Sequence, residues 1–228
     1  MDYSNLKRIR HPLLLFKFGA TEHIDQLYEE GTLHCNTIQY FAKIEDNNLR
    51  GDPDEHAFKY TQYTPGSILT ITRIEGEYKG KSIPIRLNKG TIKQYNDSAW
   101  GNLFCFYSIR LTDKPIGHEF TINSRCSEFG GSCLFILDVN EFLVRLDSAM
   151  SLLNLNGLRD FVTYHDMPNF NGERNVFQKD KRFDYQQEFR LFFKHDLLEP
   201  IHFSIGSLKD IATVYSSDIV DHFRCKLG

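Results

Sequence analysis

The sequence lacks the signatures of several large protein classes. None of its apolar runs approaches the roughly 20 residues that a helix needs to cross a bilayer, so no membrane association is expected. The motifs GxGxxG, GxxxxGK[ST] and GxSxG do not occur, which disfavours a Rossmann dehydrogenase, a P-loop nucleotidase and an α/β-hydrolase. The histidines show neither HxH nor HExxH spacing, so no metal hydrolase is indicated and no metal ligand is assigned.

Cysteine is scarce and the net charge is small. The five cysteines are scattered and include no CxxC pair, which suggests neither a disulfide framework nor a zinc site and fits a reducing cytoplasm. A formal net charge of -3 provides no global basic field of the kind that drives non-specific nucleic-acid binding. Without internal repeats, low-complexity tracts or linkers, residues 1–228 are expected to form a single domain.

Phenylalanine and other apolar residues are plentiful, and their spacing predicts a strand followed by a helix at the start of the chain. LLLFKFG (13–19) has the composition of a strand and ends at a glycine. Thr21 is a plausible N-cap for the helix, and Gly31 is a plausible left-handed stop. A short strand over 32–37 and a helical turn over 38–44 should follow.

The rest of the chain is dominated by strand patterns. A polar, carboxylate-rich loop over 45–56 precedes a mostly β region over 57–137, and the clearest helix spans 140–154. Its apolar face should lie across the sheet and contains Phe142, Leu143, Leu146, Met150 and Leu153. Further strands are expected over 159–167, in EFRLFFKH, in PIHFSIG and in IATVYSS. The predicted class is therefore α+β, with mostly antiparallel sheets and a few flanking helices.

The segment DYQQEFRLFF (184–193) carries two charges inside an apolar strand pattern. Alternation along a strand places Phe189, Leu191 and Phe193 on one face and Glu188 and Arg190 on the other. The two charged residues would then either form a modest ion pair on a solvated face or line a cleft. Gln186, two residues before Glu188, favours the cleft because it adds a second polar side chain at the start of the strand.

The spacing of Gln186 and Glu188 resembles the Q/E-x-E element of the ADP-ribosyltransferases. FKFGATEHIDQLYEEGTLHCNT also resembles the opening of that superfamily, with Lys17 where those enzymes have Arg or His. Most of the chain is similar to bacterial proteins that pair an FKFG-like strand with a late YxxE[FWY]R strand. The resemblance implies a split antiparallel fold, with NAD bound between two sheets.

The resemblance also implies roles for individual residues. Glu188 would be the catalytic carboxylate, Gln186 would orient the acceptor, and Arg190 would hold Glu188 by a bidentate contact or bind a cofactor phosphate. The chemistry agrees, because cleavage of the nicotinamide–ribose bond builds positive charge on the ribose, which a carboxylate stabilises. The residues assigned to the cofactor pocket are Lys17, Phe18, Gly19, Thr21, Tyr40 and Arg50.

The function that follows is NAD-dependent transfer of ADP-ribose to RNA, DNA or protein by a cytoplasmic bacterial toxin or antiphage effector, with an antitoxin protein as a partner. Two alternatives stay open at this point. Asp52, Glu55 and Glu188 have the oxygen ligands of a metal-dependent nuclease. Alternatively, Glu188 and Arg190 form a structural ion pair in a non-catalytic interaction module.

Overall fold

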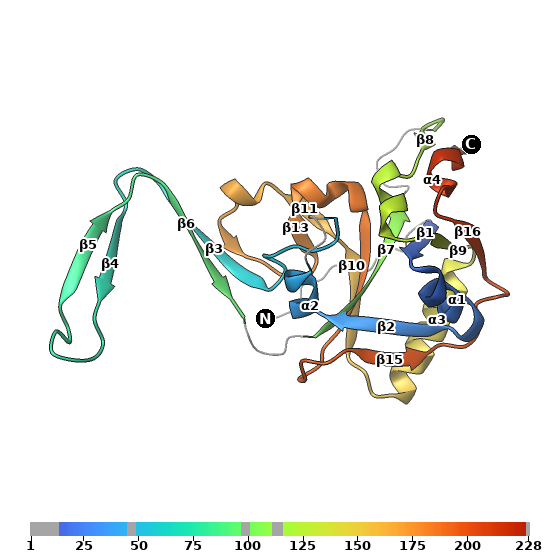
Figure 1. The fold of residues 1–228 in the computed structure, drawn as a ribbon, viewed down its shortest axis with the longest axis horizontal. Coiled ribbons are helices and arrows are strands. Elements are labelled where there is room, and N and C mark those ends of the chain that lie inside the picture. The colour runs from blue at the N-terminus through green and yellow to red at the C-terminus, as the bar shows by residue number, and fades with distance from the viewer. Residues whose placement is uncertain (1–13, 45–48, 97–100, 111–115, 227–228) are drawn as a thin grey trace.

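The structure, a computed structural model, describes residues 14–44, 49–96, 101–110 and 116–226 (Figure 1). Strands outnumber helices and almost all strand pairs are antiparallel, which confirms the predicted α+β class. Within these ranges no helix combines the length and apolar character needed to cross a bilayer.

One large sheet organises the molecule. Within the described residues it has eight strands, and all of its neighbouring strands are antiparallel. The main path runs in the order β10 (Gly157–Phe161), β14 (Glu188–Phe193), β7 (Asn102–Ile109), β1 (Leu14–Gly19), β9 (Ser132–Ile136) and β16 (Ala212–Ser216). Beside this path, β2 (Thr32–Thr37) pairs with β7 and with β15 (Ile201–Ser204).

The sheet divides at one edge of β7. At one end of this strand, Leu103 pairs with Asn36 of β2, whereas at the other end Tyr107 pairs with Phe16 of β1. Residues 104–106 lie between these two pairings, at the point where β1 and β2 diverge. We call the opening between β1 and β2, beside residues 104–106 of β7, the fork. It leaves room for a pocket inside an otherwise continuous sheet.

The helices and the smaller sheets surround the main sheet. The α-helices are α1 (Thr21–Glu30), α2 (Ile38–Lys43), α3 (Val139–Leu152) and α4 (Ile219–His222), and the 3-10 helices are η1 (Ser124–Phe129), η2 (Met167–Asn169) and η3 (Lys181–Gln186). The additional strand pairs are β3 (Ala57–Tyr63) with β6 (Gly90–Tyr95) and β12 (Gly172–Glu173), β4 (Ile68–Thr72) with β5 (Ser82–Arg86), β8 (Glu119–Phe120) with β17 (Cys225–Lys226), and the parallel pair β11 (Thr163–His165) with β13 (Gln178–Asp180).

The predicted alternation in β14 is confirmed. Phe189, Leu191 and Phe193 enter the largest hydrophobic core, together with apolar residues of α1 and α3, while Phe192 packs into a separate cluster on the other face. All six residues of β14 are buried. Burial on both faces explains why this strand is almost continuously apolar and why its two charged residues require internal partners.

Three local predictions need correction. Ala20, not Thr21, is the N-cap of α1, and the Thr21 hydroxyl instead lies 2.9 Å from that of Ser132. Leu153 is 52% exposed because α3 ends at Leu152, before the expected apolar face is complete. The strand expected over 159–167 is divided at Val162, since β10 pairs with β14 but β11 pairs with β13.

Gly31 ends α1 as predicted, and its replacement by alanine should be costly. Gly31 has φ 65°, a left-handed conformation, and an added Cβ would collide with the carbonyl oxygen of Gly206. We expect Gly31→Ala to lower the free energy of unfolding by more than about 1 kcal/mol, measured by urea denaturation. Gly90→Ala is the matched control, because an added Cβ there meets open space. Equal stability of the two variants would contradict this prediction.

Candidate active site

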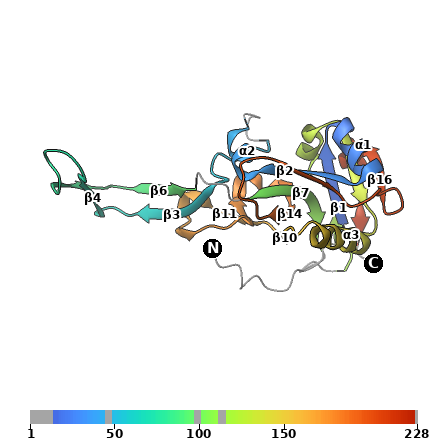
Figure 2. The same cartoon turned by 90° about the horizontal axis from the view of Figure 1, so that it is seen from below.

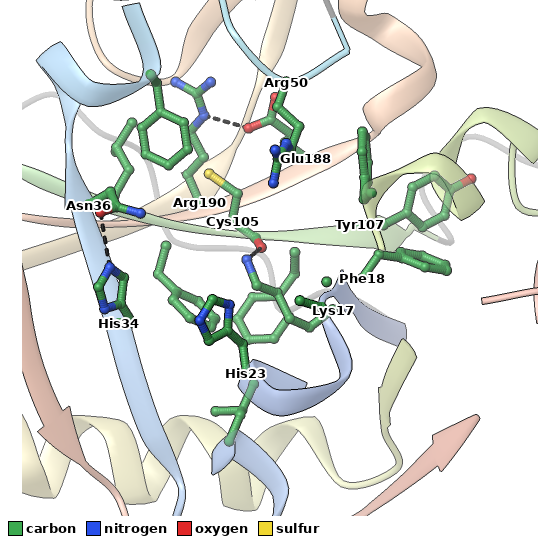
Figure 3. Close-up of a pocket in the computed structure, with 18 of the residues that line it drawn as sticks. Lys17, Phe18, His23, His34, Asn36, Arg50, Cys105, Tyr107, Glu188 and Arg190 are labelled. Carbon is green, nitrogen blue, oxygen red and sulfur yellow. Dashed lines mark hydrogen bonds and ion pairs between the residues drawn. The ribbon is translucent and has the colours of Figure 1, made fainter. Parts of the chain in front are cut away.

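A pocket of about 910 Å³ occupies the fork. Its walls come from β1, β2, β7, β14, α1 and α2, which are far apart in the sequence (Figure 3). Pockets of this volume hold ligands of cofactor size. The predicted catalytic and cofactor-binding segments therefore meet at one cavity, although β7 separates β1 from β14 in the sheet.

Glu188 and Arg190 border this pocket and are almost completely buried, with 6% and 1% of their surface exposed. The Arg190 Nε donates to Glu188 Oε2 at 2.8 Å, so the two residues do form an ion pair. Their placement on a solvated sheet face is excluded by this burial. The bidentate contact of Arg190 goes to Glu55, at 2.5 and 3.1 Å, rather than to Glu188 as expected. Because Arg190 also donates to the Val176 carbonyl, a role in phosphate binding is not supported.

Lys179 is a central member of the site that the sequence pattern did not reveal. Its ammonium donates to Glu188 Oε1 at 2.8 Å and to Gln186 Oε1 at 2.7 Å, and only 3% of the residue is exposed. The Gln186 amide in turn donates to the Leu49 carbonyl at 2.7 Å. Both ends of the Gln186 amide are thus engaged inside the protein, and it holds Lys179 and the 49–55 loop in place.

Two carboxylates of the polar loop, in its described part over residues 49–56, are buried. Asp52 and Glu55 are 0% and 4% exposed. Arg174, itself buried, lies 3.3 Å from Asp52 and 3.8 Å from Glu55. Together with Glu188, these carboxylates and the buried cations form what we call the buried charge network. Its members are Asp52, Glu55, Glu188, Arg174, Lys179 and Arg190.

The charge network argues against a metal site. Each of the proposed ligands Asp52, Glu55 and Glu188 contacts at least one buried cation. A divalent ion would have to displace these cations while they remain buried, at a large electrostatic cost. Across the described residues, no group of acidic, histidine or cysteine side chains is arranged to hold a metal ion. The nuclease alternative therefore has no structural support.

Glu188 is held in its ionised form. Burial on its own would raise the pKa of the Glu188 carboxyl, but the neighbouring Arg190 and Lys179 outweigh it and lower the pKa well below the ordinary glutamate value. The backbone N–H of Glu188 donates to the Tyr164 hydroxyl at 2.9 Å, which also fixes the start of β14. A fixed carboxylate that is ionised near neutral pH consequently forms part of the pocket wall.

Lys17 projects into the pocket from β1. Its ammonium donates to the Cys105 carbonyl at 2.9 Å and lies 4.2 Å from the centre of the Phe104 ring. Within the described ranges it has no ion-pair partner, and burial lowers its pKa. A partly buried ammonium beside a cavity is a favourable site for an anionic ligand.

The other predicted cofactor residues divide into two groups. Phe18, Gly19, Tyr40 and Arg50 line the pocket, and Tyr40 is 45% exposed, which leaves its ring accessible for stacking. Thr21 lies outside the pocket wall, since its side chain turns toward Ser132. Figure 3 shows Arg50 next to Glu188, with Lys17 on the opposite side of Cys105.

Three histidines at the other end of the pocket were not anticipated. His23, His34 and His202 come from α1, β2 and β15, and the Nδ1 atoms of His34 and His202 lie 3.0 Å apart. The His34 Nε2 is 3.0 Å from the Asn36 Oδ1, and burial lowers the pKa of His34. No sequence spacing signals this cluster because its members belong to separate elements. It adds hydrogen-bonding groups to the pocket.

The geometry thus unites a fixed carboxylate, a partly buried ammonium and the exposed ring of Tyr40 around one cavity. Comparison of the chain with protein-family models, with curated proteins and with solved structures finds no match in any of the three.

Proposed function

We propose that the protein binds NAD in the fork and transfers its ADP-ribose to a macromolecule. The observation that carries this proposal is the position of Glu188, an ionised carboxylate in the wall of a pocket that also contains the partly buried ammonium of Lys17. An oxocarbenium-like transition state needs a negative charge at the ribose, and a dinucleotide pyrophosphate needs a positive one. In the pocket, Glu188 supplies the negative charge and Lys17 the positive one.

Glu188 would act through electrostatic stabilisation. Its carboxylate is held by Lys179 and Arg190 on separate oxygens, so its position would change little when the substrate arrives. Each carboxylate oxygen has further acceptor capacity, which a ribose hydroxyl could use. As the nicotinamide leaves, the growing positive charge on the ribose would strengthen this contact more in the transition state than in the ground state.

Lys17 and the aromatic residues would bind the cofactor. The Lys17 ammonium has donors beyond the one that reaches the Cys105 carbonyl, and these suit a pyrophosphate oxygen. Tyr40 and Phe41 meet edge to face, with ring centroids 5.4 Å apart, and both line the pocket. They provide a surface on which a nicotinamide or adenine ring can stack.

The acceptor would be RNA, DNA or protein, in keeping with a toxin or antiphage effector. An enzyme that modifies macromolecules of its own cell would require a neutralising protein partner until it is needed. The buried charge network favours one competing function, a non-catalytic interaction module in which Glu188 and Arg190 have only a structural role. The effect of Glu188→Gln on catalysis separates the two.

Replacement of Lys17 by methionine tests the pocket directly. We expect wild-type protein to bind NAD, and Lys17→Met to weaken this binding by about 10- to 100-fold, the usual effect of losing a charged hydrogen bond. The variant should be as stable as wild type or more so, because methionine removes the cost of burying an ammonium. Isothermal titration calorimetry and urea denaturation measure the two effects.

Lys43→Met, at the exposed end of α2, is the matched control and should bind NAD like wild type. Wild-type protein that does not bind NAD, or equal binding by all three proteins, would refute the proposed function.

A further inference from the structure

A long two-stranded arm, residues 57–95, projects from the body of the protein (Figures 1 and 2). We call it the ribbon. β3 and β6 form its base, where β12 adds a third strand beside β3, and β4 and β5 form its two-stranded outer part. Every residue from 70 to 86 is exposed. Isolated two-stranded ribbons bury little surface and contribute little to the stability of a domain. The outer ribbon therefore does not serve the core of the protein, whereas Ala57 and Tyr60 at the base are buried in a small cluster with Met167.

Positive charge is concentrated in the ribbon. Its residues include seven Lys and Arg but only two Glu, a net charge of +5. Since the whole chain carries -3, the remaining residues carry -8. The basic residues are Lys59, Arg73, Lys79, Lys81, Arg86, Lys89 and Lys93. A basic projection on an acidic body is the charge distribution expected for a local polyanion contact.

The strand register gives the outer ribbon two different faces. Leu69 pairs with Ile85 and Ile71 with Ile83, so these four aliphatic side chains share one face. The opposite face contains Thr72 and Ser82, whose hydroxyls are 2.7 Å apart, and Arg86. A two-stranded ribbon fits the major groove of B-DNA, where aliphatic groups can contact thymine methyls and basic groups can reach phosphates.

Near the tip, basic and aromatic groups lie together. The Lys81 ammonium is 4.6 Å and the Arg73 guanidinium 5.7 Å from the centre of the Tyr78 ring. All three residues are exposed. Such contacts hold the two cations near the end of the ribbon, where they would meet the DNA backbone first.

We propose that the ribbon binds duplex DNA in a groove. A second copy of the chain is a weaker candidate for the apolar face, because two ribbons that each carry +5 would repel one another. DNA provides the complementary charge along the whole length of the arm. Its release of counterions supplies the binding energy that four aliphatic side chains alone would not.

This inference also bears on the acceptor, and that part rests on the proposed function. At the ribbon base, Lys93 and Tyr95 donate to the Asp54 carboxylate at 2.6 and 2.8 Å. Asp54 adjoins Glu55, which pairs with Arg190 at the pocket. DNA held by the ribbon would thus lie beside a segment that continues into the pocket wall, which makes DNA the favoured acceptor.

Anisotropy of a fluorescent duplex of about 30 base pairs, measured without NAD over a range of salt concentrations, tests the binding. We expect wild-type protein to bind, with an affinity that falls steeply as salt rises. Replacing all five outer cations by glutamine (R73Q, K79Q, K81Q, R86Q and K89Q) should weaken binding by about 100-fold or more. The fall of log K with log salt should also become shallower, by about 0.9 in slope for each phosphate that the variant no longer neutralises.

The matched control is Lys194→Gln with Lys226→Gln, two exposed lysines outside the ribbon, and it should bind like wild type. Circular dichroism verifies that each variant is folded. The proposal is overturned if wild-type protein does not bind duplex DNA, or if the ribbon variant binds as tightly as the control. It is also overturned if the ribbon variant loses only self-association or only binding to anionic vesicles. Because the assay omits NAD, its failure leaves the proposed NAD chemistry unaffected.

Discussion

Replacement of Glu188 by glutamine is expected to lower the rate of nicotinamide release from NAD by about 100- to 1,000-fold. Glutamine has nearly the same shape but no charge, so it removes the attraction that grows as the ribose becomes positive. NAD binding should change much less, because this attraction acts mainly in the transition state. Release of labelled nicotinamide, measured over a range of NAD concentrations in the presence of duplex DNA and cell lysate, separates kcat from KM.

A loss of stability has to be distinguished from a loss of catalysis, since Glu188→Gln also leaves Lys179 and Arg190 with less negative charge. Leu146→Ala is a suitable control because Leu146 is buried in α3, away from the pocket, and its truncation should cost about 2–5 kcal/mol. We expect this control to retain wild-type kcat at temperatures where it is folded. A Glu188→Gln protein that is destabilised but fully active would establish the purely structural role of the ion pair.

Removal of the Glu55 side chain should have the largest effect on stability. Glu55→Ala leaves Arg190 without its bidentate partner in a site that is 1% exposed, and loss of one partner of a buried pair costs about 3–5 kcal/mol. Urea denaturation at neutral pH measures the free energy of unfolding. Glu22→Ala, an exposed change in the first turn of α1, should alter it by less than about 0.5 kcal/mol.

The loss of unfolding free energy in Glu55→Ala should depend on pH. Burial favours a higher pKa for Glu55, but Arg190, Lys179 and Arg174 together lower it below the ordinary value of 4.5. A lowered carboxyl pKa contributes stability above the ordinary value, and this contribution is lost as the pH falls through the folded-state pKa. The difference between wild type and Glu55→Ala should therefore be constant near neutral pH and shrink below about pH 4.5. A difference under about 1 kcal/mol at neutral pH would show that the network is not stabilising.

Several features of the fold could be predicted from the sequence because they depend on neighbours in the chain. The alternation of Phe189 and Leu191 with Arg190 follows from the geometry of any strand, and it correctly separated the two faces of β14. The stop at Gly31 follows from a backbone conformation that glycine adopts easily. Lys17 and Glu188 both line the pocket. Their placement at one site was predicted from the resemblance at the two ends of the chain.

Other features depended on contacts that local patterns do not encode. Lys179 and Arg174 lie in segments as polar as any surface loop, and nothing in their spacing distinguishes them from solvated residues. They are buried because carboxylates from the 49–55 loop and β14 reach them across the fold. The burial of Asp52 and Glu55 could not be read from the polar loop for the same reason, since only partners distant in sequence offset the free-energy cost of burying a charge.

The sequence by itself determined most of the secondary structure, the two faces of β14 and the presence of a charged pair in that strand, because these are properties of residues within a few positions of one another. Tertiary structure alone decided that β1 and β2 diverge from β7 to open a pocket, that three histidines meet there, and that the outer ribbon of β4 and β5 extends away from the core. Each of these depends on which strands pair and which remain unpaired. That choice is made by the packing of the whole chain, where burial and charge pairing across long sequence distances outweigh local preference.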